Sequence, residues 1–211
     1  MILKQYKFLF VPIPKCAGTS LRKTLQPYSQ INSFKVVYGE DYKGIIGKIR
    51  GKVSKLEKYF KTILTEPQTH REIVTELTQS DYFVFTLVRN FYARSVSLWK
   101  YLQPKMSFVQ FVSWLEYNKA TKSFYDLAHI KPCSFTLNFY KDMFPYHYVG
   151  LVENLNQDIE HICRQLGLSS LDVPQLNQTK HHTYDRYYTE ELVKRIEKIC
   201  DRDFQLFDYK F

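Results

Sequence analysis

The apolar positions of the chain predict several short strands. Residues 8–11 (FLFV) form an uninterrupted apolar run, as expected of a strand buried on both faces, and Pro12 and Pro14 end it. Residues 82–88 (YFVFTLV) carry the strongest strand signal, and their almost continuous apolar character suits the centre of a parallel sheet. Further runs with strand character lie at residues 34–38 and 146–152.

Between these runs, apolar residues recur at the spacing of one helix face. Asn154 can cap a helix that ends at Gly167, and Ser107 can cap another. Other helices are expected after Gly18 and at residues 53–64, 70–77, 93–102, 107–117 and 189–200, with a polar loop at residues 174–188. Strands that alternate with helices predict an α/β layered fold, whose ligands bind at the carboxyl ends of the parallel strands.

Length and composition fit one folded domain. The chain has 211 residues, of which 45% are hydrophobic and 17% aromatic, enough for one substantial core. No repeat, low-complexity tract or Pro/Gly/Ser linker divides it. We therefore expect residues 1–211 to form a single α/β domain with a central, mainly parallel sheet flanked by helices.

The charge of the chain favours an anionic partner. Thirty Lys and Arg residues against twenty-one Asp and Glu leave a formal charge of +9. This charge suits a nucleotide, a polyanionic polymer, nucleic acid or an acidic membrane surface without choosing among them. The first strand begins within about ten residues of Met1, and no apolar run approaches the ~18 residues of a membrane span. A soluble protein of a reducing cytoplasm is therefore expected.

The cysteines are far apart and form no CxxC pair, so neither a zinc site nor a disulfide framework is expected. They are Cys16, Cys133, Cys163 and Cys200. The thiol of Cys16, beside a predicted helix N-terminus, is expected to have a lowered pKa and to oxidise readily. A buried, inert thiol is the alternative.

The turn after the first strand has the residue types of a phosphate site. Lys15 stands at this turn, and the small residues 16–18 allow backbone N–H groups to approach an anion closely. Thr19 or Ser20 can cap the helix that follows. The lysine precedes the only glycine of this segment, whereas a Walker A loop has its lysine after the glycines. A nucleotide site is expected, but the usual ATP or GTP assignment is weakened.

A second anion site is indicated where the strand at residues 82–88 ends. Arg89 follows that strand, and Arg94 and Ser97 are three residues apart, hence neighbours on one helix face. An arginine fork and a serine hydroxyl suit a phosphate monoester. Taken alone, the first cluster also fits a turn with an incidental lysine, and the second fits a surface arginine beside a packing serine.

Together the two clusters resemble one family, the sulfotransferases that use 3′-phosphoadenosine 5′-phosphosulfate (PAPS). Residues 15–21 (KCAGTSL) are similar to the loop that binds the 5′-phosphosulfate. Residues 88–101 (VRNFYARSVSLWKY) are similar to the 3′-phosphate-binding strand and helix, usually R-[ND]-P-[FY]-x-R-x-x-S-x-[YW], although Phe91 replaces the proline. Weaker likenesses to the carbohydrate branch of the family, in a soluble bacterial-type form, follow at residues 70–73, 148–168, 177–179 and 201–211.

The resemblance implies a P-loop-like fold, PAPS as donor, adenosine 3′,5′-bisphosphate (PAP) as product, and no metal. Lys15 would hydrogen-bond the bridging oxygen of the phosphosulfate, while Arg89 and Ser97 hold the 3′-phosphate. The remaining donor-binding residues implied are Cys16, Ala17, Gly18, Thr19, Ser20 and Leu21 at the 5′-phosphate, and Thr179 and Lys180 closing over the nucleotide.

The acceptor hydroxyl needs a base, and His70 is the first choice. A histidine with a pKa near neutrality suits proton abstraction, and related enzymes place a histidine before the 3′-phosphate strand. Glu40 and Glu66 are rivals, and a purely structural His70 is the alternative. His181 and His182, in the late polar loop, can instead contact the acceptor. The resemblance implies a carbohydrate or glycan acceptor, which the basic surface would suit if it is anionic.

Two other functions remain open at this point. A P-loop kinase of a small metabolite would require magnesium and ATP, but no Walker B acid is evident after an apolar strand. A basic nucleic-acid-binding module would explain the charge of +9 and the seventeen tyrosines. It would not explain anion motifs at two strand ends, so no nucleic-acid partner is expected. The identity of the acceptor and the oligomeric state are not determined by the sequence.

Overall fold

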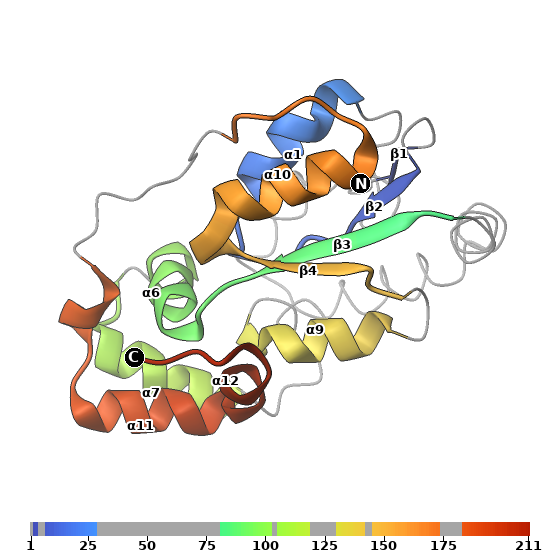
Figure 1. Cartoon of the computed structure of the whole chain (residues 1–211). Coiled ribbons are helices and arrows are strands. Elements are labelled where there is room, and N and C mark those ends of the chain that lie inside the picture. Colours follow the sequence, from blue (N-terminus) through green and yellow to red (C-terminus); the bar gives the residue numbers. More distant parts are fainter. Residues whose placement is uncertain are drawn as a thin grey trace, which may run out of the picture.

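The computed structural model describes residues 2–3, 7–28, 81–102, 105–118, 130–141, 145–173 and 183–211. These residues form an α/β fold in which helices cover both faces of a sheet (Figure 1). The α/β fold with a mainly parallel sheet is thereby confirmed. The predicted strand at residues 34–38 and the predicted helices at residues 53–64 and 70–77 lie outside the described residues.

The strands of the described residues lie in the order β1-β2-β3-β4. Their bounds are Ile2–Leu3 for β1, Phe8–Phe10 for β2, Phe83–Val88 for β3 and Tyr148–Leu151 for β4. The last three are parallel, whereas β1 pairs antiparallel with β2. The apolar strand β3 lies between β2 and β4, as its composition predicted. Because β2 and β3 are parallel, the segments that follow them begin at the same edge of the sheet.

The described helices include every one that the sequence predicted in these ranges. Their bounds are Gly18–Leu25 (α1), Phe91–Leu102 (α6), Phe108–Asn118 (α7), Cys133–Tyr140 (α9), Leu155–Leu166 (α10), Glu190–Ile199 (α11) and Asp201–Phe207 (α12), with 3₁₀ turns at Gln26–Tyr28, Val152–Asn154 and Tyr184–Tyr187. Helices α9 and α12 were not predicted, because each is short and its apolar residues form no extended stripe. The 3₁₀ turn at Tyr184–Tyr187 falls in the predicted polar loop.

Of the helix N-caps predicted at Ser107 and Asn154, Ser107 is confirmed and Asn154 is not. Ser107 and Gln110 form a capping box, in which the Gln110 N–H donates to Ser107 Oγ (3.2 Å) and the Ser107 N–H donates to Gln110 Oε1 (2.9 Å). Asn154 precedes α10, but its side chain makes no capping hydrogen bond. This prediction was wrong because a 3₁₀ turn runs into α10, and Asn154 lacks the extended backbone of a typical cap. Gly167 ends the helix in the left-handed conformation, as predicted.

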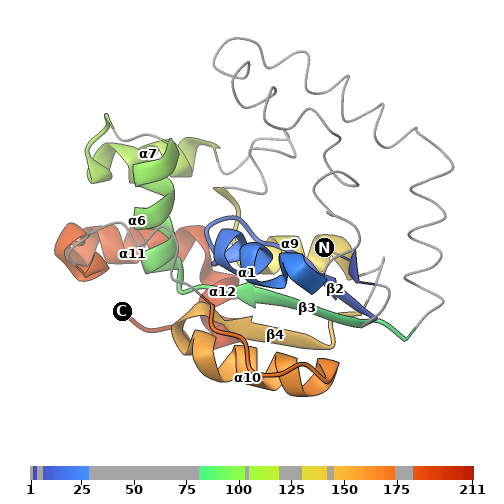
Figure 2. The same cartoon turned by 90° about the horizontal axis from the view of Figure 1, so that it is seen from above.

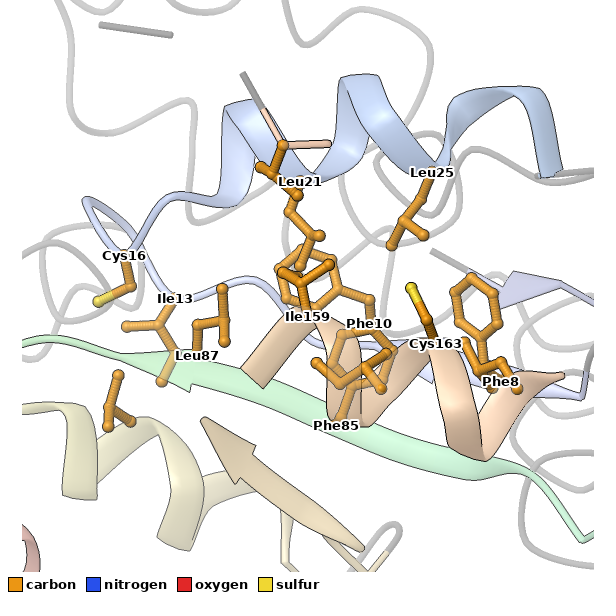
Figure 3. Packing of buried hydrophobic residues seen from close by; sticks show 14 of the residues in the cluster. Phe8, Phe10, Ile13, Cys16, Leu21, Leu25, Phe85, Leu87, Ile159 and Cys163 are labelled. Carbon is orange, nitrogen blue, oxygen red and sulfur yellow. The ribbon is translucent and has the colours of Figure 1, made fainter. Parts of the chain in front are cut away.

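Two large hydrophobic clusters and a smaller third one stabilise the described part of the fold. In the first, side chains of β2 and β3 pack against α1 and α10 on one face of the sheet, while α9 and α12 lie on the other (Figures 1 and 2). Figure 3 shows Leu21 and Leu25 of α1 above Phe10 and Phe85, whose ring centroids are 5.2 Å apart. The second cluster joins α6, α7 and α11 beyond the carboxyl ends of the strands. The loop after β2 therefore lies where the two clusters meet.

Candidate active site

The loop between β2 and α1 has an unusual backbone. Lys15 and Ala17 adopt the left-handed conformation (φ 67° and 54°), whereas Cys16 between them does not. For residues other than glycine this costs roughly 1–2 kcal/mol each. When left-handed residues alternate with others along the backbone, successive N–H groups point into one concavity, called a nest, which can bind an anion. The N-terminus of α1, which also favours anions, follows directly. We call residues 12–18 the phosphate loop.

The first helical turn differs from the sequence prediction. Helix α1 begins at Gly18, and the Leu21 N–H donates to the carbonyl of Ala17 (3.0 Å). Thr19 and Ser20 therefore lie within the first turn, and the prediction that one of them caps the helix was wrong. The left-handed Ala17 takes the position before the helix, and an alanine side chain offers no acceptor to the N–H groups of the first turn.

The structure brings the two predicted anion clusters together. Arg89, at the end of β3, donates from a terminal guanidinium nitrogen to the carbonyl oxygen of Lys15 (3.4 Å). Burial first, and then the charge of Arg89, lower the pKa of Lys15, while Cys16 acts in the opposite direction. The charge of Arg89 thus repels the ammonium of Lys15, and a bound anion would relieve that repulsion.

Arg94 supports the phosphate loop from α6. Its side chain is fully buried, and it donates from Nε to the carbonyl of Pro14 (3.0 Å) and from a terminal nitrogen to the carbonyl of Lys131 (2.7 Å). Its guanidinium also lies over the ring of Phe91, 5.4 Å from the centroid. Arg94 therefore holds the loop in place, and the half-buried Ser97 lies one turn further along the same helix.

Cys16 does not have the environment that its sequence position suggested. Its thiol is fully buried, and its Sγ lies 3.8 Å from the Sγ of Cys133, which is also fully buried. Burial, together with the hydrogen bond to Cys133, raises the pKa of Cys16 well above its usual value. The expected lowering of this pKa was wrong, because loss of solvation outweighs the nearby helix N-terminus.

Asn90 is a site residue that the sequence reading missed. Its Oδ1 accepts a hydrogen bond from the Tyr92 N–H (2.9 Å), so it caps α6, and its Nδ2 donates to the carbonyl of Lys210 (3.3 Å). Its own N–H donates to Glu153 Oε1 (2.9 Å). An asparagine directly before a helical stripe was a readable capping signal. These contacts fix the angle at which α6 leaves β3, just after Arg89.

Several predicted site residues lie outside the described residues, and their roles remain predictions. They are the base candidate His70, its rivals Glu40 and Glu66, the loop residues Thr179 and Lys180, and His181 and His182. In the part of the chain that is described, no group of three or more His, Cys, Asp or Glu side chains could hold a metal ion. Among the described helices, none has the length and apolar character that a membrane crossing requires.

Comparison with known proteins bears directly on this arrangement. The model of the sulfotransferase family matches residues 1–210 of the chain. The chain belongs to the sulfotransferase family. Its structure is similar to the crystal structure of a sulfotransferase from Alicyclobacillus acidocaldarius, with a TM-score of 0.54, 17% sequence identity, and coverage of 97% of this chain and 96% of that one. At this identity the likeness shows the fold. The search of curated protein sequences finds no match.

Family and fold together support sulfuryl transfer as the general reaction of this sulfotransferase. The family resemblance seen in residues 15–21 and 88–101 is thereby confirmed.

Proposed function

We propose that this sulfotransferase moves the sulfuryl group of PAPS to a hydroxyl of a carbohydrate or glycan acceptor and releases PAP. The observation that carries the proposal is the meeting of Lys15, Arg89 and the left-handed phosphate loop at one edge of the sheet. A donor with a phosphosulfate at one end and a 3′-phosphate at the other needs anion-binding groups from two adjacent strand ends.

Lys15 would act on the bond that breaks. The acceptor oxygen attacks sulfur, the bond between sulfur and the bridging oxygen breaks, and negative charge passes to the 5′-phosphate of PAP. An ammonium that is half-buried interacts more strongly with this charge than one in bulk water would. Transfer of this kind depends on positioning and charge neutralisation, since the donor is already activated.

The 5′-phosphate would be bound by the phosphate loop and the first turn of α1. Backbone N–H groups of Gly18, Thr19 and Ser20 and the hydroxyls in this turn would supply donors, while Cys16 and Ala17 complete the backbone nest. Leu21 would close the turn around the phosphate, since its own N–H donates to the carbonyl of Ala17. Ser20 is buried, so its backbone has a fixed place in the helix start. Gly18 has little room for a side chain, because an added Cβ would lie 3.3 Å from the Cβ of Pro12.

Arg89 and Ser97 would bind the 3′-phosphate. The contact of Arg89 with the Lys15 carbonyl uses one of its five N–H donors, which leaves the fork able to bind phosphate. We further propose that Thr179 and Lys180 close over the nucleotide, that His70 takes the acceptor proton, and that no metal takes part.

Titration calorimetry with PAP tests the donor assignment. PAP should bind in the presence of EDTA, and Arg89→Ala should weaken binding about 10- to 100-fold, as expected for charge-assisted hydrogen bonds. Arg164→Ala is the matched control, because Arg164 is exposed near the end of α10 and the same charge is removed. Binding of ATP with magnesium but not of PAP would favour a kinase, and salt-sensitive binding of nucleic acid without PAP would favour a nucleic-acid module.

The base and the acceptor need an activity assay. Incubation with radiolabelled PAPS and a panel of polysaccharides, oligosaccharides and small sugars should label at least one acceptor. His70→Ala should then abolish turnover while PAP affinity stays nearly unchanged. If turnover survives this substitution, the base would be Glu40, Glu66 or another residue.

A further inference from the structure

The ring of Tyr101 lies against the ammonium of Lys15. Tyr101 is near the C-terminal end of α6, and Lys15 Nζ is 4.4 Å from the centroid of its ring. This distance is within the range of about 6 Å over which an aromatic face attracts a cation. Tyr101 is also 49% exposed, so the contact is formed at the surface of the site.

The face of α6 that meets the phosphate loop explains this contact. Arg94, Ser97 and Tyr101 are separated by three and four residues, so they share one helix face. Arg94 donates to the carbonyl of Pro14, and Tyr101 reaches the side chain of the next residue, Lys15. Since Arg89 binds the carbonyl of Lys15, the backbone and the side-chain end of this lysine are both held.

The groups around Lys15 affect whether its side chain is protonated. Arg89 faces Lys15 from the end of β3, and its charge disfavours the ammonium, while Arg94 donates to the carbonyl of the preceding residue. Burial acts in the same direction, and the Cys16 thiol in the opposite one. The electron-rich face of Tyr101 favours the ammonium without adding a carboxylate that would repel a phosphosulfate.

We propose that Tyr101 is a positioning residue that keeps Lys15 protonated and holds its ammonium at the mouth of the phosphate loop before the donor binds. The importance of Lys15 for the reaction rests on the proposed function. The contact between ring and ammonium is a property of the free protein, and it can be tested without donor or acceptor.

Competitive labelling of amines provides that test. The free protein is modified with trace acetic anhydride at a series of pH values, and mass spectrometry of the Lys15 peptide gives the pH midpoint of its reactivity. Tyr101→Leu should lower the midpoint by about half a pH unit, a roughly threefold change in the protonation equilibrium. Tyr101→Phe and Tyr101→Trp, which keep a ring, should leave it within a fraction of that shift.

Tyr117→Leu is the matched control. Tyr117 is 86% exposed on α7, and its replacement should leave the Lys15 midpoint unchanged. In the activity assay, the alkaline limb of kcat/KM should move to lower pH in Tyr101→Leu and return in Tyr101→Phe. A wild-type midpoint in Tyr101→Leu, or an equal shift in Tyr101→Phe, would overturn the proposal.

The outcomes separate this inference from the proposed function. If PAP fails to bind the wild-type protein, the donor assignment fails, while the midpoints of the four variants still decide whether Tyr101 controls Lys15. If PAP binds and the midpoints do not differ, only the role of Tyr101 is lost.

Discussion

Lys15 carries its charge in surroundings that do not favour it. Its backbone is left-handed, its side chain is half-buried, and Arg89 contacts its carbonyl. Burial and Arg89 both lower the pKa of Lys15. An anion bound beside Lys15 would raise this pKa again, so donor binding and protonation of Lys15 are linked.

The affinity for PAP should therefore depend on pH. Below the lowered pKa, Lys15 is already charged and affinity is constant. As pH rises through that pKa, binding must take up a proton, and affinity should fall by up to about tenfold per pH unit. Lys15→Arg should flatten this fall because a guanidinium keeps its charge. Calorimetry in buffers of different ionisation heat measures the proton uptake, and an equal fall in Lys15→Arg would exclude Lys15 as its source.

The two buried thiols are expected to react slowly with alkylating reagents. Cys16 and Cys133 are fully buried. The pKa of Cys16 is raised, whereas the hydrogen bond to Cys16 lowers the pKa of Cys133, so burial is what keeps both thiols from a reagent. Both should react with iodoacetamide at least about 100-fold more slowly in the native protein than in denaturant. Peptide mass spectrometry after timed quenching gives the rate for each cysteine. Rapid labelling of Cys16 in the native protein would restore the reactive-thiol interpretation.

At the scale of elements, helix ends are stabilised by residues distant in the sequence. The carboxylate of Asp203, on α12, is fully buried and accepts hydrogen bonds from the N–H groups of Cys133 (2.6 Å) and Ser134 (2.7 Å), which begin α9. Helix α11 has a local cap instead, since Thr189 Oγ1 accepts from the Leu192 N–H (3.3 Å). The buried cap fixes α9, and with it Cys133, beneath the phosphate loop.

Removal of these two caps should have different costs. Asp203→Ala leaves two buried N–H groups without their acceptor and should lower the free energy of unfolding by about 2–4 kcal/mol. Thr189→Ala loses a single local cap and should cost about 1 kcal/mol. Urea unfolding followed by circular dichroism gives both values. Equal and small losses would mean that α9 does not depend on Asp203.

At the scale of the whole molecule, the site lies between the two hydrophobic clusters. The phosphate loop belongs to the cluster on the sheet, α6 belongs to the cluster of helices, and Arg94 joins them through the carbonyls of Pro14 and Lys131. Donor affinity should therefore depend on this connection as well as on the residues that touch the donor.

Comparison of Arg94→Met with a core variant should distinguish a loss of stability from a loss of PAP affinity. Loss of the guanidinium leaves two carbonyls without this donor and should lower the free energy of unfolding by about 2–4 kcal/mol. PAP affinity should also fall, by about tenfold, because the phosphate loop loses its support. Leu115→Ala, in the second cluster, should cost about 2–5 kcal/mol and leave PAP affinity unchanged where the protein is folded. Equal PAP affinity in both variants would contradict the role of Arg94.

Local pattern accounts for what could be predicted here. The strands at residues 8–11 and 82–88, the helical stripes, and the placing of Lys15 and Arg89 at strand ends follow from periodicity and turn residues within a few positions. Parallel pairing of β2 and β3 then brings Lys15 and Arg89 to one edge. The family resemblance of residues 15–21 and 88–101 depended on the same local segments.

The sequence alone determined most of the described elements, the basic charge and the two anion motifs. Only the tertiary structure decided how individual groups behave: that Cys16 is buried against Cys133, that Arg94 braces the phosphate loop, that Asp203 caps α9, and that Tyr101 faces Lys15. The physical reason is the separation along the chain over which each effect acts. Backbone propensity and periodicity act over a few residues, whereas solvation, pKa and hydrogen-bond partners depend on groups that folding brings together from as far as 120 positions apart.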